Sequence, residues 1–287
     1  MMPVISVITA TFNAAATLEA MILSVINQTY QSVELIIIDG GSTDDTISLI
    51  EKYKTRISYW VSEKDEGIYD ALNKGIKVAN GDWVYILGSD DTLITPSVLN
   101  DLFSARNIEG IQFLYGNTRL KSNNKLLGGS RTYEQLIEKN ISHQAIFYHK
   151  TLFTTMGFFD LRYKILSDYD YNLKVFAHSE IKTSYVDVDI CLFNDKGGAS
   201  NVTIDGCFFS DKLRHFVNVD NFSPTDGALQ QYNFYHGVTL LLQKKKISGL
   251  IYCFRSFFNG RRKIFYMLVF IKFMIGALGI GKKIKFS

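Results

Sequence analysis

Residues 33–45 read VELIIIDGGSTDD. The apolar, β-branched run from Val33 to Ile38 is typical of a buried strand, and Asp39-Gly40-Gly41 ends it in a turn. Ser42 to Asp45 then favour a helix start, because short polar side chains cap the free N–H groups of a helix N-terminus. The stretch predicts a strand, a turn and a helix in succession, the unit from which parallel α/β sheets are built.

The same alternation extends on both sides of this stretch. Residues 4–9 form an earlier strand pattern, and residues 14–28 carry apolar side chains at helical spacing. Further strands are predicted over residues 57–61 and 83–87, with a helix over residues 69–78 between them. We therefore expect an α/β fold in which a Rossmann-like, mainly parallel sheet lies between helices.

Polar clusters follow the predicted strands at the end where each strand stops. They are Thr11 to Asn13, Asp39 to Asp44, Glu63 to Asp70, and Ser89 to Asp91. In open parallel sheets, ligands bind outside the carboxyl ends of the strands. These clusters are therefore the first candidates for a ligand site.

The second half of the chain has a mixed pattern. Strands are predicted over residues 113–115, 145–148 and 185–192, and a helix is predicted over residues 168–177. From about residue 210 onward the pattern is helical. We expect a catalytic domain over residues 1–210 and a C-terminal helical region over residues 211–287.

Charge is distributed unevenly along the chain. Residues 227–287 contain eleven Lys or Arg and no Asp or Glu, whereas residues 1–226 contain all 28 acidic residues. Residues 264–280 are apolar apart from Lys272, and this run is shorter than the roughly 20 residues that span a bilayer. We expect the tail to lie in the membrane surface as a monotopic segment. The alternative is an apolar helix packed on the catalytic body.

The cysteines and the first residues predict a compartment. Cys191, Cys207 and Cys253 are far apart and match no metal-ligand spacing, so reduced thiols are expected. The N-terminal residues show no secretory-signal pattern. We expect a cytoplasmic protein, peripheral or monotopic at the inner face of the cell membrane.

The turn that begins at Asp39 is acidic. The sequence has neither a GxxxxGK[ST] loop nor a G-x-G-x-x-G after its first strand, the usual phosphate-binding turns. A carboxylate in such a turn can instead accept hydrogen bonds from a uracil N–H or from ribose hydroxyls. The alternative for Ser42, Asp44 and Asp45 is helix capping and favourable interaction with the helix dipole.

A second acidic turn is Ser89-Asp90-Asp91. Carboxylates at a strand end can hold a hard divalent cation and leave positions open for phosphate oxygens. Such a cation offsets the charge that grows on a nucleotide diphosphate as its sugar bond breaks. The alternative is a solvated acidic turn before Pro96.

Ordered motifs extend over about residues 2–200. They are VITATFN (7–13), SVINQTY (24–30), ELIIIDGGSTDD (34–45), EKDEGIYDALNKG (63–75), SDD (89–91), HQ (143–144), GFFD (157–160) and SDYD (167–170). With these motifs the chain resembles the inverting glycosyltransferase family 2, most closely the branch that builds bacterial O-antigen and capsule repeat units. The resemblance implies the GT-A fold and transfer of a sugar from a nucleotide diphosphate.

Roles carry over from the resemblance residue by residue. It implies a nucleotide and donor site formed by Thr9, Thr11, Asn13, Asp39, Asp70, Asn73 and Asp90. It implies that Asp91 binds Mn²⁺ or Mg²⁺ directly and that Asp168 is the general base. His143 is expected to contact the acceptor or the donor phosphates, with a structural role as the alternative. Many relatives have Glu where this chain has Ser167, so Asp170 is the alternative base.

The reaction chemistry agrees with these roles. An inverting transfer is one in-line displacement, in which a carboxylate takes the proton of the acceptor hydroxyl. We expect non-processive transfer from a UDP-sugar to an undecaprenyl-diphosphate-linked saccharide at the membrane surface, and no nucleic-acid partner. The sugar, the acceptor, and the choice between UDP and dTDP stay open.

The sequence also bears on three alternative functions. A processive polysaccharide synthase is disfavoured because the Gln-x-x-Arg-Trp motif is missing. A sugar nucleotidyltransferase usually opens with a basic, glycine-rich loop, whereas the opening here is acidic. A binding module without catalysis is disfavoured because the four carboxylates Asp39, Asp90, Asp91 and Asp168 are all present.

Overall fold

The computed structural model describes nearly all of residues 2–196 and portions of the C-terminal region. The described residues are 2–104, 106–196, 208, 233, 234, 237, 238, 241, 246–258, 267 and 270. The chain forms two compact units. Unit 1 comprises Met1–Ser130, Ile141–Lys164 and His178–Gly198, and unit 2 comprises Arg131–Asn140, Ile165–Ala177 and Ala199–Ser287. The boundary predicted near residue 210 lies outside the described residues.

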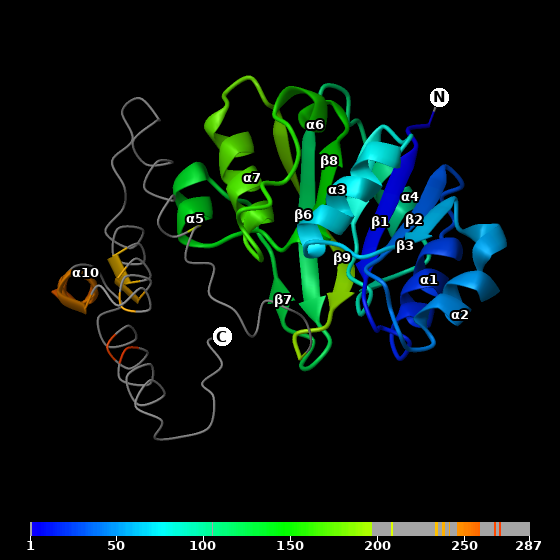
Figure 1. Ribbon diagram of the computed structural model, residues 1–287. Coiled ribbons are helices and arrows are strands. Elements are labelled where there is room, and N and C mark those ends of the chain that lie inside the picture. The colour runs from blue at the N-terminus through cyan, green and yellow to red at the C-terminus, as the bar shows by residue number, and fades with distance from the viewer. Residues whose placement is uncertain are drawn as a thin grey trace. The chain divides into compact units, whose positions relative to one another are not determined.

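The first half of unit 1 is a parallel sheet. Its strands are β1 (Ile5–Thr11), β2 (Val33–Asp39), β3 (Tyr59–Ser62) and β4 (Trp83–Ile86), in the spatial order β3-β2-β1-β4. Figure 1 shows β1, β2 and β3 side by side. Thr11 pairs with Asp39, and Asp39 pairs with Ser62. The carboxyl ends of three strands therefore meet at one edge, as the sequence predicts.

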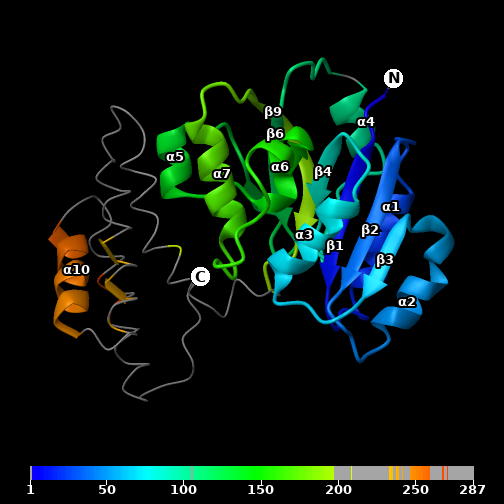
Figure 2. The same cartoon turned by 45° about the horizontal axis from the view of Figure 1, so that its top comes forward.

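Helices α1 (Leu18–Ile26), α2 (Thr46–Lys52) and α3 (Ile68–Val78) connect these strands. Right-handed crossovers place α1 and α2 on one face of the sheet and α3 on the other. Figure 2 shows α3 across β1. Gly75 allows this close approach, because a Cβ at that position would lie 2.4 Å from Ile8 Cγ2.

The second half of unit 1 extends the same sheet. The order continues from β4 through β8 (Ile146–His149), β6 (Phe113–Leu120) and β9 (Thr183–Phe193) to β5 (Thr92–Leu93), and β7 (Leu126–Leu127) pairs with β6. β8 runs antiparallel to both β4 and β6, and β5 runs antiparallel to β9. The sheet is therefore mixed: β1 to β4 pair in parallel as predicted, whereas in the second half β6 and β9 pair in parallel and the other pairings are antiparallel. Short helices α4 (Val98–Phe103) and α6 (Thr151–Thr155) complete the unit.

The start of α2 differs from the sequence prediction. The helix begins at Thr46, and Ser42 does not cap it. The Ser42 hydroxyl instead donates a hydrogen bond to Asp39. Asp44 accepts bonds from the backbone N–H and the hydroxyl of Thr46. Ser42 therefore shapes the turn after β2, a role that helix propensity does not reveal, whereas Asp44 bonds the first residue of α2.

Unit 2 contains α5 (Tyr133–Glu138), α7 (Ser167–Ala177) and α10 (Lys246–Phe258). The Tyr169 hydroxyl on α7 lies 2.7 Å from the carbonyl oxygens of Leu136 and Ile137 on α5, which locks the two helices together. No helix in the described part of the chain is long and apolar enough to cross a membrane. The run over residues 264–280 lies outside the described residues except for Met267 and Phe270.

Candidate functional site

The turn after β2 is organised around Asp39. Its carboxylate is fully buried and accepts hydrogen bonds from Gly41 N (3.0 Å), Ser42 N (2.8 Å) and the Ser62 hydroxyl (2.6 Å). The Ser42 hydroxyl donates a fourth bond to the other carboxylate oxygen. A carboxylate offers about four acceptor positions, so Asp39 is largely engaged in holding the turn. Its contact with a nucleobase stays a prediction.

Asn13 connects the loop after β1 to this turn. Its φ of 49° lies in the left-handed region, which Asn tolerates better than most residues. Its backbone N–H donates to Ser42 Oγ at 2.8 Å, and its Oδ1 accepts from Thr43 N at 2.9 Å. The neighbouring Phe12 is 61% exposed. The two loops therefore form one edge that carries an exposed aromatic ring.

The two threonines of β1 differ in their partners. Thr9 is buried, and its hydroxyl donates to Leu87 O at 2.9 Å. Thr11 is also buried and lies beside Asp39, but its Oγ1 has no hydrogen-bond partner among the described residues. Buried polar atoms in folded proteins nearly always have partners. Thr11 is therefore a candidate ligand contact. The Thr9 hydroxyl is engaged with Leu87, and a contact between Thr9 and the nucleotide stays a prediction.

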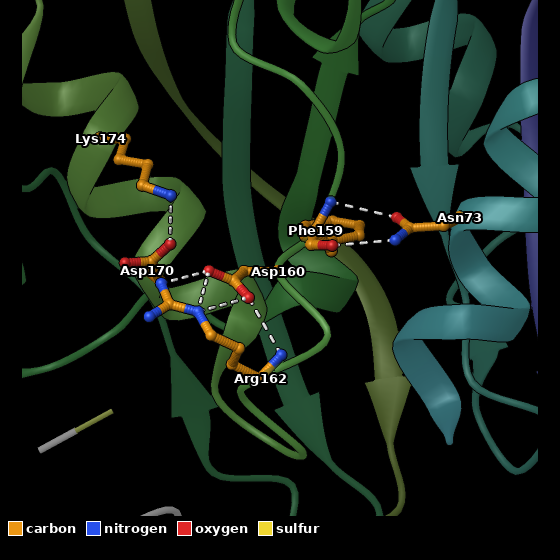
Figure 3. A network of polar contacts seen from close by, with 6 residues as sticks. All are labelled: Asn73, Phe159, Asp160, Arg162, Asp170 and Lys174. Carbon is orange, nitrogen blue, oxygen red and sulfur yellow. Dashed lines mark hydrogen bonds and ion pairs between the residues drawn. The ribbon is translucent and has the colours of Figure 1, made fainter. Parts of the chain in front are cut away.

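The first turns of α3 hold the predicted donor-site residues Asp70 and Asn73. Asp70 Oδ2 accepts from Glu66 N at 3.1 Å and lies 3.2 Å from Lys74 Nζ. Burial by itself raises the pKa of Asp70, but these partners outweigh it and the pKa lies below its ordinary value. Both polar atoms of the Asn73 amide bond the backbone of Phe159, at 2.9 and 3.1 Å (Figure 3). Asp70 is thus held ionised, and Asn73 fixes the loop at Phe159.

The turn after β4 presents the Asp90–Asp91 pair. Asp91 is only 1% exposed; its Oδ1 accepts from Asn194 N at 2.7 Å and its Oδ2 from Gln144 Nε2 at 2.9 Å. Burial raises the pKa of Asp91 above its ordinary value. A Cβ at Gly88 would lie 2.5 Å from Asp91 Oδ2, so glycine lets the turn close on the carboxylate.

Asp90 is the more exposed member of the pair. Asn194 Nδ2 donates to Asp90 Oδ2 at 3.0 Å, and Lys121 Nζ donates to the Asp90 carbonyl oxygen at 2.6 Å. The Lys121 backbone also donates to Phe193 O at 2.8 Å. The ends of β6 and β9 therefore hold the acidic turn from two sides and place an ammonium group beside it.

His143 and Gln144 lie in a short 3₁₀ turn over His143–Ala145. The side-chain oxygen of Gln144 accepts from the Ser142 hydroxyl at 2.6 Å, and the backbone carbonyl of Gln144 accepts from the Tyr85 hydroxyl at 2.9 Å. Burial raises the pKa of Asp91, and the nearby, half-buried His143 partly offsets this by lowering it. The structure thus places His143 beside the acidic turn, while a contact between His143 and a ligand stays a prediction.

The acidic turn fits a divalent cation that arrives together with a diphosphate. No group of three or more His, Cys, Asp or Glu in the described part of the chain could hold a metal ion. Mg²⁺ characteristically takes one or two carboxylates and completes its shell with water and phosphate oxygens. Asp90 Oδ1 has no hydrogen-bond partner in that same part of the chain. A cation here would also favour the charged form of Asp91, which burial disfavours.

Two asparagine side chains of unit 2 hold Asp168 in a chain of hydrogen bonds. It is nearly buried, its Oδ2 accepts from Asn140 Nδ2 at 3.0 Å, and Asn140 Oδ1 accepts from Asn172 Nδ2 at 3.0 Å. Asp170, the alternative base, lies 2.6 Å from Lys174 Nζ, as Figure 3 shows. Because Asp170 already forms an ion pair with Lys174, Asp168 is the better candidate for proton transfer.

Sequence reasoning missed four residues that organise these carboxylates: Lys121, Asn140, Gln144 and Asn194. Two of them left a signal in the sequence, because Gln144 follows His143 in the HQ motif and Asn194 comes two residues after the strand predicted over residues 185–192. Lys121 and Asn140 lie in loops whose partners are far along the chain, so no local pattern marks them.

Comparison with known proteins identifies relatives of the chain. The profile of the family described as "Glycosyl transferase family 2" matches residues 6–170. A protein of Mycobacterium bovis (strain BCG / Pasteur 1173P2), described as "PGL/p-HBAD biosynthesis glycosyltransferase", is 36% identical over 208 residues, which cover 71% of this chain and 81% of that protein.

Two further proteins are similar over different shares of the chain. The Escherichia coli protein "UDP-Glc:alpha-D-GlcNAc-diphosphoundecaprenol beta-1,3-glucosyltransferase WfgD" is 33% identical over 149 residues, 52% of this chain and 54% of that protein. The crystal structure of S. aureus TarS 1-349 in complex with UDP-GlcNAc superposes with a TM-score of 0.65 at 18% identity, covering 83% of this chain and 71% of that chain. This structural likeness supports the GT-A type of fold.

Proposed function

The chain belongs to glycosyltransferase family 2 and is a glycosyltransferase that uses a nucleotide sugar, and we propose that it moves a single sugar from a UDP-sugar to a hydroxyl of a lipid-linked saccharide. In this proposal the transfer inverts the anomeric centre, depends on a divalent cation and is non-processive. The product is a repeat unit of a bacterial surface polysaccharide such as O-antigen or capsule.

The donor nucleotide is assigned to the edge formed by β1 and β2. Thr11 offers a buried hydroxyl without a partner among the described residues, and the exposed Phe12 ring offers a face on which a base can stack. Asn13 and Asp39 fix the two loops that carry these groups. UDP is proposed as the carrier because WfgD is named for UDP-Glc and the TarS structure holds UDP-GlcNAc.

The observation that carries the proposal is the Asp90–Asp91 turn. A buried carboxylate with a raised pKa, next to a second carboxylate with an open oxygen, is an arrangement that a cation stabilises. Mn²⁺ or Mg²⁺ would supply Lewis-acid stabilisation of the departing diphosphate. Asp91 is proposed as the direct ligand, held by Gln144 and Asn194. The ammonium of Lys121 adds positive charge at the same turn.

Proton removal from the acceptor hydroxyl is assigned to Asp168. A general base must be ionised and oriented, and Asn140 donates to one carboxylate oxygen of Asp168 and fixes its direction. The leaving diphosphate needs no proton when a cation neutralises it, so the proposal includes no general acid.

The acceptor and its location follow from the relatives and the charge of the tail. WfgD is named for a diphosphoundecaprenol-linked acceptor, and residues 227–287 are strongly basic and rich in apolar residues. We therefore place the enzyme at the inner face of the cell membrane.

Donor binding by calorimetry tests this function. UDP, dTDP, GDP and their common sugars are titrated into the full chain with and without Mn²⁺. The expected result is tight, Mn²⁺-dependent binding of one UDP-sugar that is lost in Asp91→Asn. Absence of binding to every nucleotide would contradict the proposed donor site, and preference for dTDP or GDP would change the carrier but keep the reaction class.

A further inference from the structure

One face of α10 is buried within unit 2. Cys253 on this face is fully buried and packs with Phe234 and Val238. Gly249 contacts a second segment so closely that a Cβ on it would lie 2.8 Å from Gly237 O. This face of the helix is therefore used in folding the unit.

The opposite face of α10 is apolar and exposed. Ile247, Ile251 and Phe254 are 78%, 48% and 51% exposed. At about 100° per residue these three side chains fall within an arc of roughly 60°, and Gly249 lies on the far side of the helix. Single exposed apolar residues are normal on a protein surface, but a continuous stripe marks an interaction site.

Basic residues flank this stripe in the sequence, and Arg255 lies on the same helix. Arg255 is exposed and lies next to the stripe on the helix surface. Lys244 to Lys246 precede or begin the helix, and Arg261 to Lys263 follow it. No acidic residue occurs between residues 227 and 287, so nothing in the sequence of this region offsets the charge.

We propose that the α10 stripe of Ile247, Ile251 and Phe254 docks unit 2 onto an anionic phospholipid surface. An apolar stripe bordered by Lys and Arg is the pattern of a helix that lies in the membrane interface, where the apolar side chains enter the acyl boundary and the basic ones contact phosphate. The helix has 13 residues, fewer than the roughly 20 that span a bilayer. A second copy of the chain is disfavoured as the occupant, because it would bring the same positive charge to the contact.

Docking of α10 onto a bilayer would explain how the enzyme reaches a lipid-linked acceptor. This part of the argument rests on the proposed function. Asp168 belongs to the same compact unit as α10. Within that unit, the Tyr169 ring lies 5.0 Å from the ring of Phe208. A lipid-docked unit 2 would keep the proposed base near the bilayer, where a lipid-linked hydroxyl is found.

Vesicle flotation tests the proposal on the full chain. The probes are vesicles of pure phosphatidylcholine and vesicles of phosphatidylcholine with phosphatidylglycerol. The wild type is expected to float with the anionic vesicles, and less so in high salt, because screening weakens the basic contacts. The double variant Ile251→Ser/Phe254→Ser is expected to lower the vesicle partition coefficient by at least tenfold.

A matched control substitutes two exposed apolar residues of unit 1, Leu23→Ser/Leu126→Ser, which are 37% and 45% exposed. This control is expected to float like the wild type, and far-ultraviolet circular dichroism checks that both variants fold. Should the α10 variant misfold, the single variant Ile247→Ser at the most exposed position repeats the test.

Three outcomes would overturn the proposal. They are wild-type protein that binds no vesicles, an α10 variant that floats like the wild type, and an α10 variant that only changes the oligomeric state in light scattering. Binding of UDP with Mn²⁺ is measured on the same samples. If the wild type binds no nucleotide, the proposed function is contradicted. The flotation result still tests independently whether α10 docks onto an anionic lipid surface.

Discussion

Gln144→Met removes the amide that donates to the buried oxygen Oδ2 of Asp91. Methionine has nearly the length and volume of glutamine, so the change leaves little cavity and mainly removes the donor. The bond is 2.9 Å long, and Gln144 and Asp91 are both buried. The bond from the Tyr85 hydroxyl goes to the backbone carbonyl of residue 144 and is kept.

The magnitude follows from the charge of the acceptor. A hydrogen bond to an ionised group contributes about 1.5–3 kcal/mol, and an orphaned buried acceptor cannot recover it from water. We expect the free energy of unfolding to fall by about that amount, and Tm to fall by roughly 2–4 °C for each kcal/mol. The Ser142 hydroxyl also loses its acceptor, but it is only partly buried and can turn to water.

The assay is urea and thermal denaturation of the metal-free protein, followed by Mn²⁺-dependent UDP binding. Loss of a residue that orients a metal ligand typically weakens metal affinity by about 10- to 100-fold, so Mn²⁺ should be needed at correspondingly higher concentration. Gln31→Met is the matched control, because Gln31 is exposed and bonds only a neighbouring carbonyl in the described structure. Unchanged stability and unchanged Mn²⁺ dependence in Gln144→Met would refute the reasoning.

Three further predictions concern the carboxylates and the packing of α3. Asp91→Asn should abolish transfer and weaken Mn²⁺-dependent donor binding, and unchanged turnover would remove the metal assignment. Asp168→Asn should keep donor binding but remove transfer in a single-turnover assay; if Asp170→Asn behaves in this way instead, the base is misplaced by two residues. Gly75→Ala should lower the free energy of unfolding by about 1–3 kcal/mol in urea denaturation, because its Cβ would collide with buried Ile8; a neutral effect would mean that α3 shifts freely on the sheet.

The sequence alone determined the parallel half of the fold. Strand and helix alternate with distinct apolar periods over the first 90 residues, and each element has the right length for a strand–helix–strand unit. The predicted clusters at Thr11–Asn13, at Asp39 and at Asp90–Asp91 lie at the strand ends in the structure. This was predictable because a parallel sheet brings carboxyl ends to one edge whatever the details of packing.

The second half of the sheet was not predictable in the same way. β8 inserts between β4 and β6 with antiparallel pairing, and β9 pairs in parallel with β6 across a register shift. Such pairings join segments up to about 70 residues apart, and short apolar runs carry no information on their partner or direction.

Only the tertiary structure decided how the site residues are held. Ser42 resembles a helix cap in the sequence, yet its hydroxyl goes to Asp39. Asp91 resembles a solvated acidic residue, yet Gln144 and Asn194 reach it from far along the chain, and burial raises its pKa. The sequence determined which chemical groups gather at the strand ends, because periodicity and turn residues are local. The tertiary structure decided which of them are buried, paired or open to a ligand, because those properties depend on contacts between distant segments.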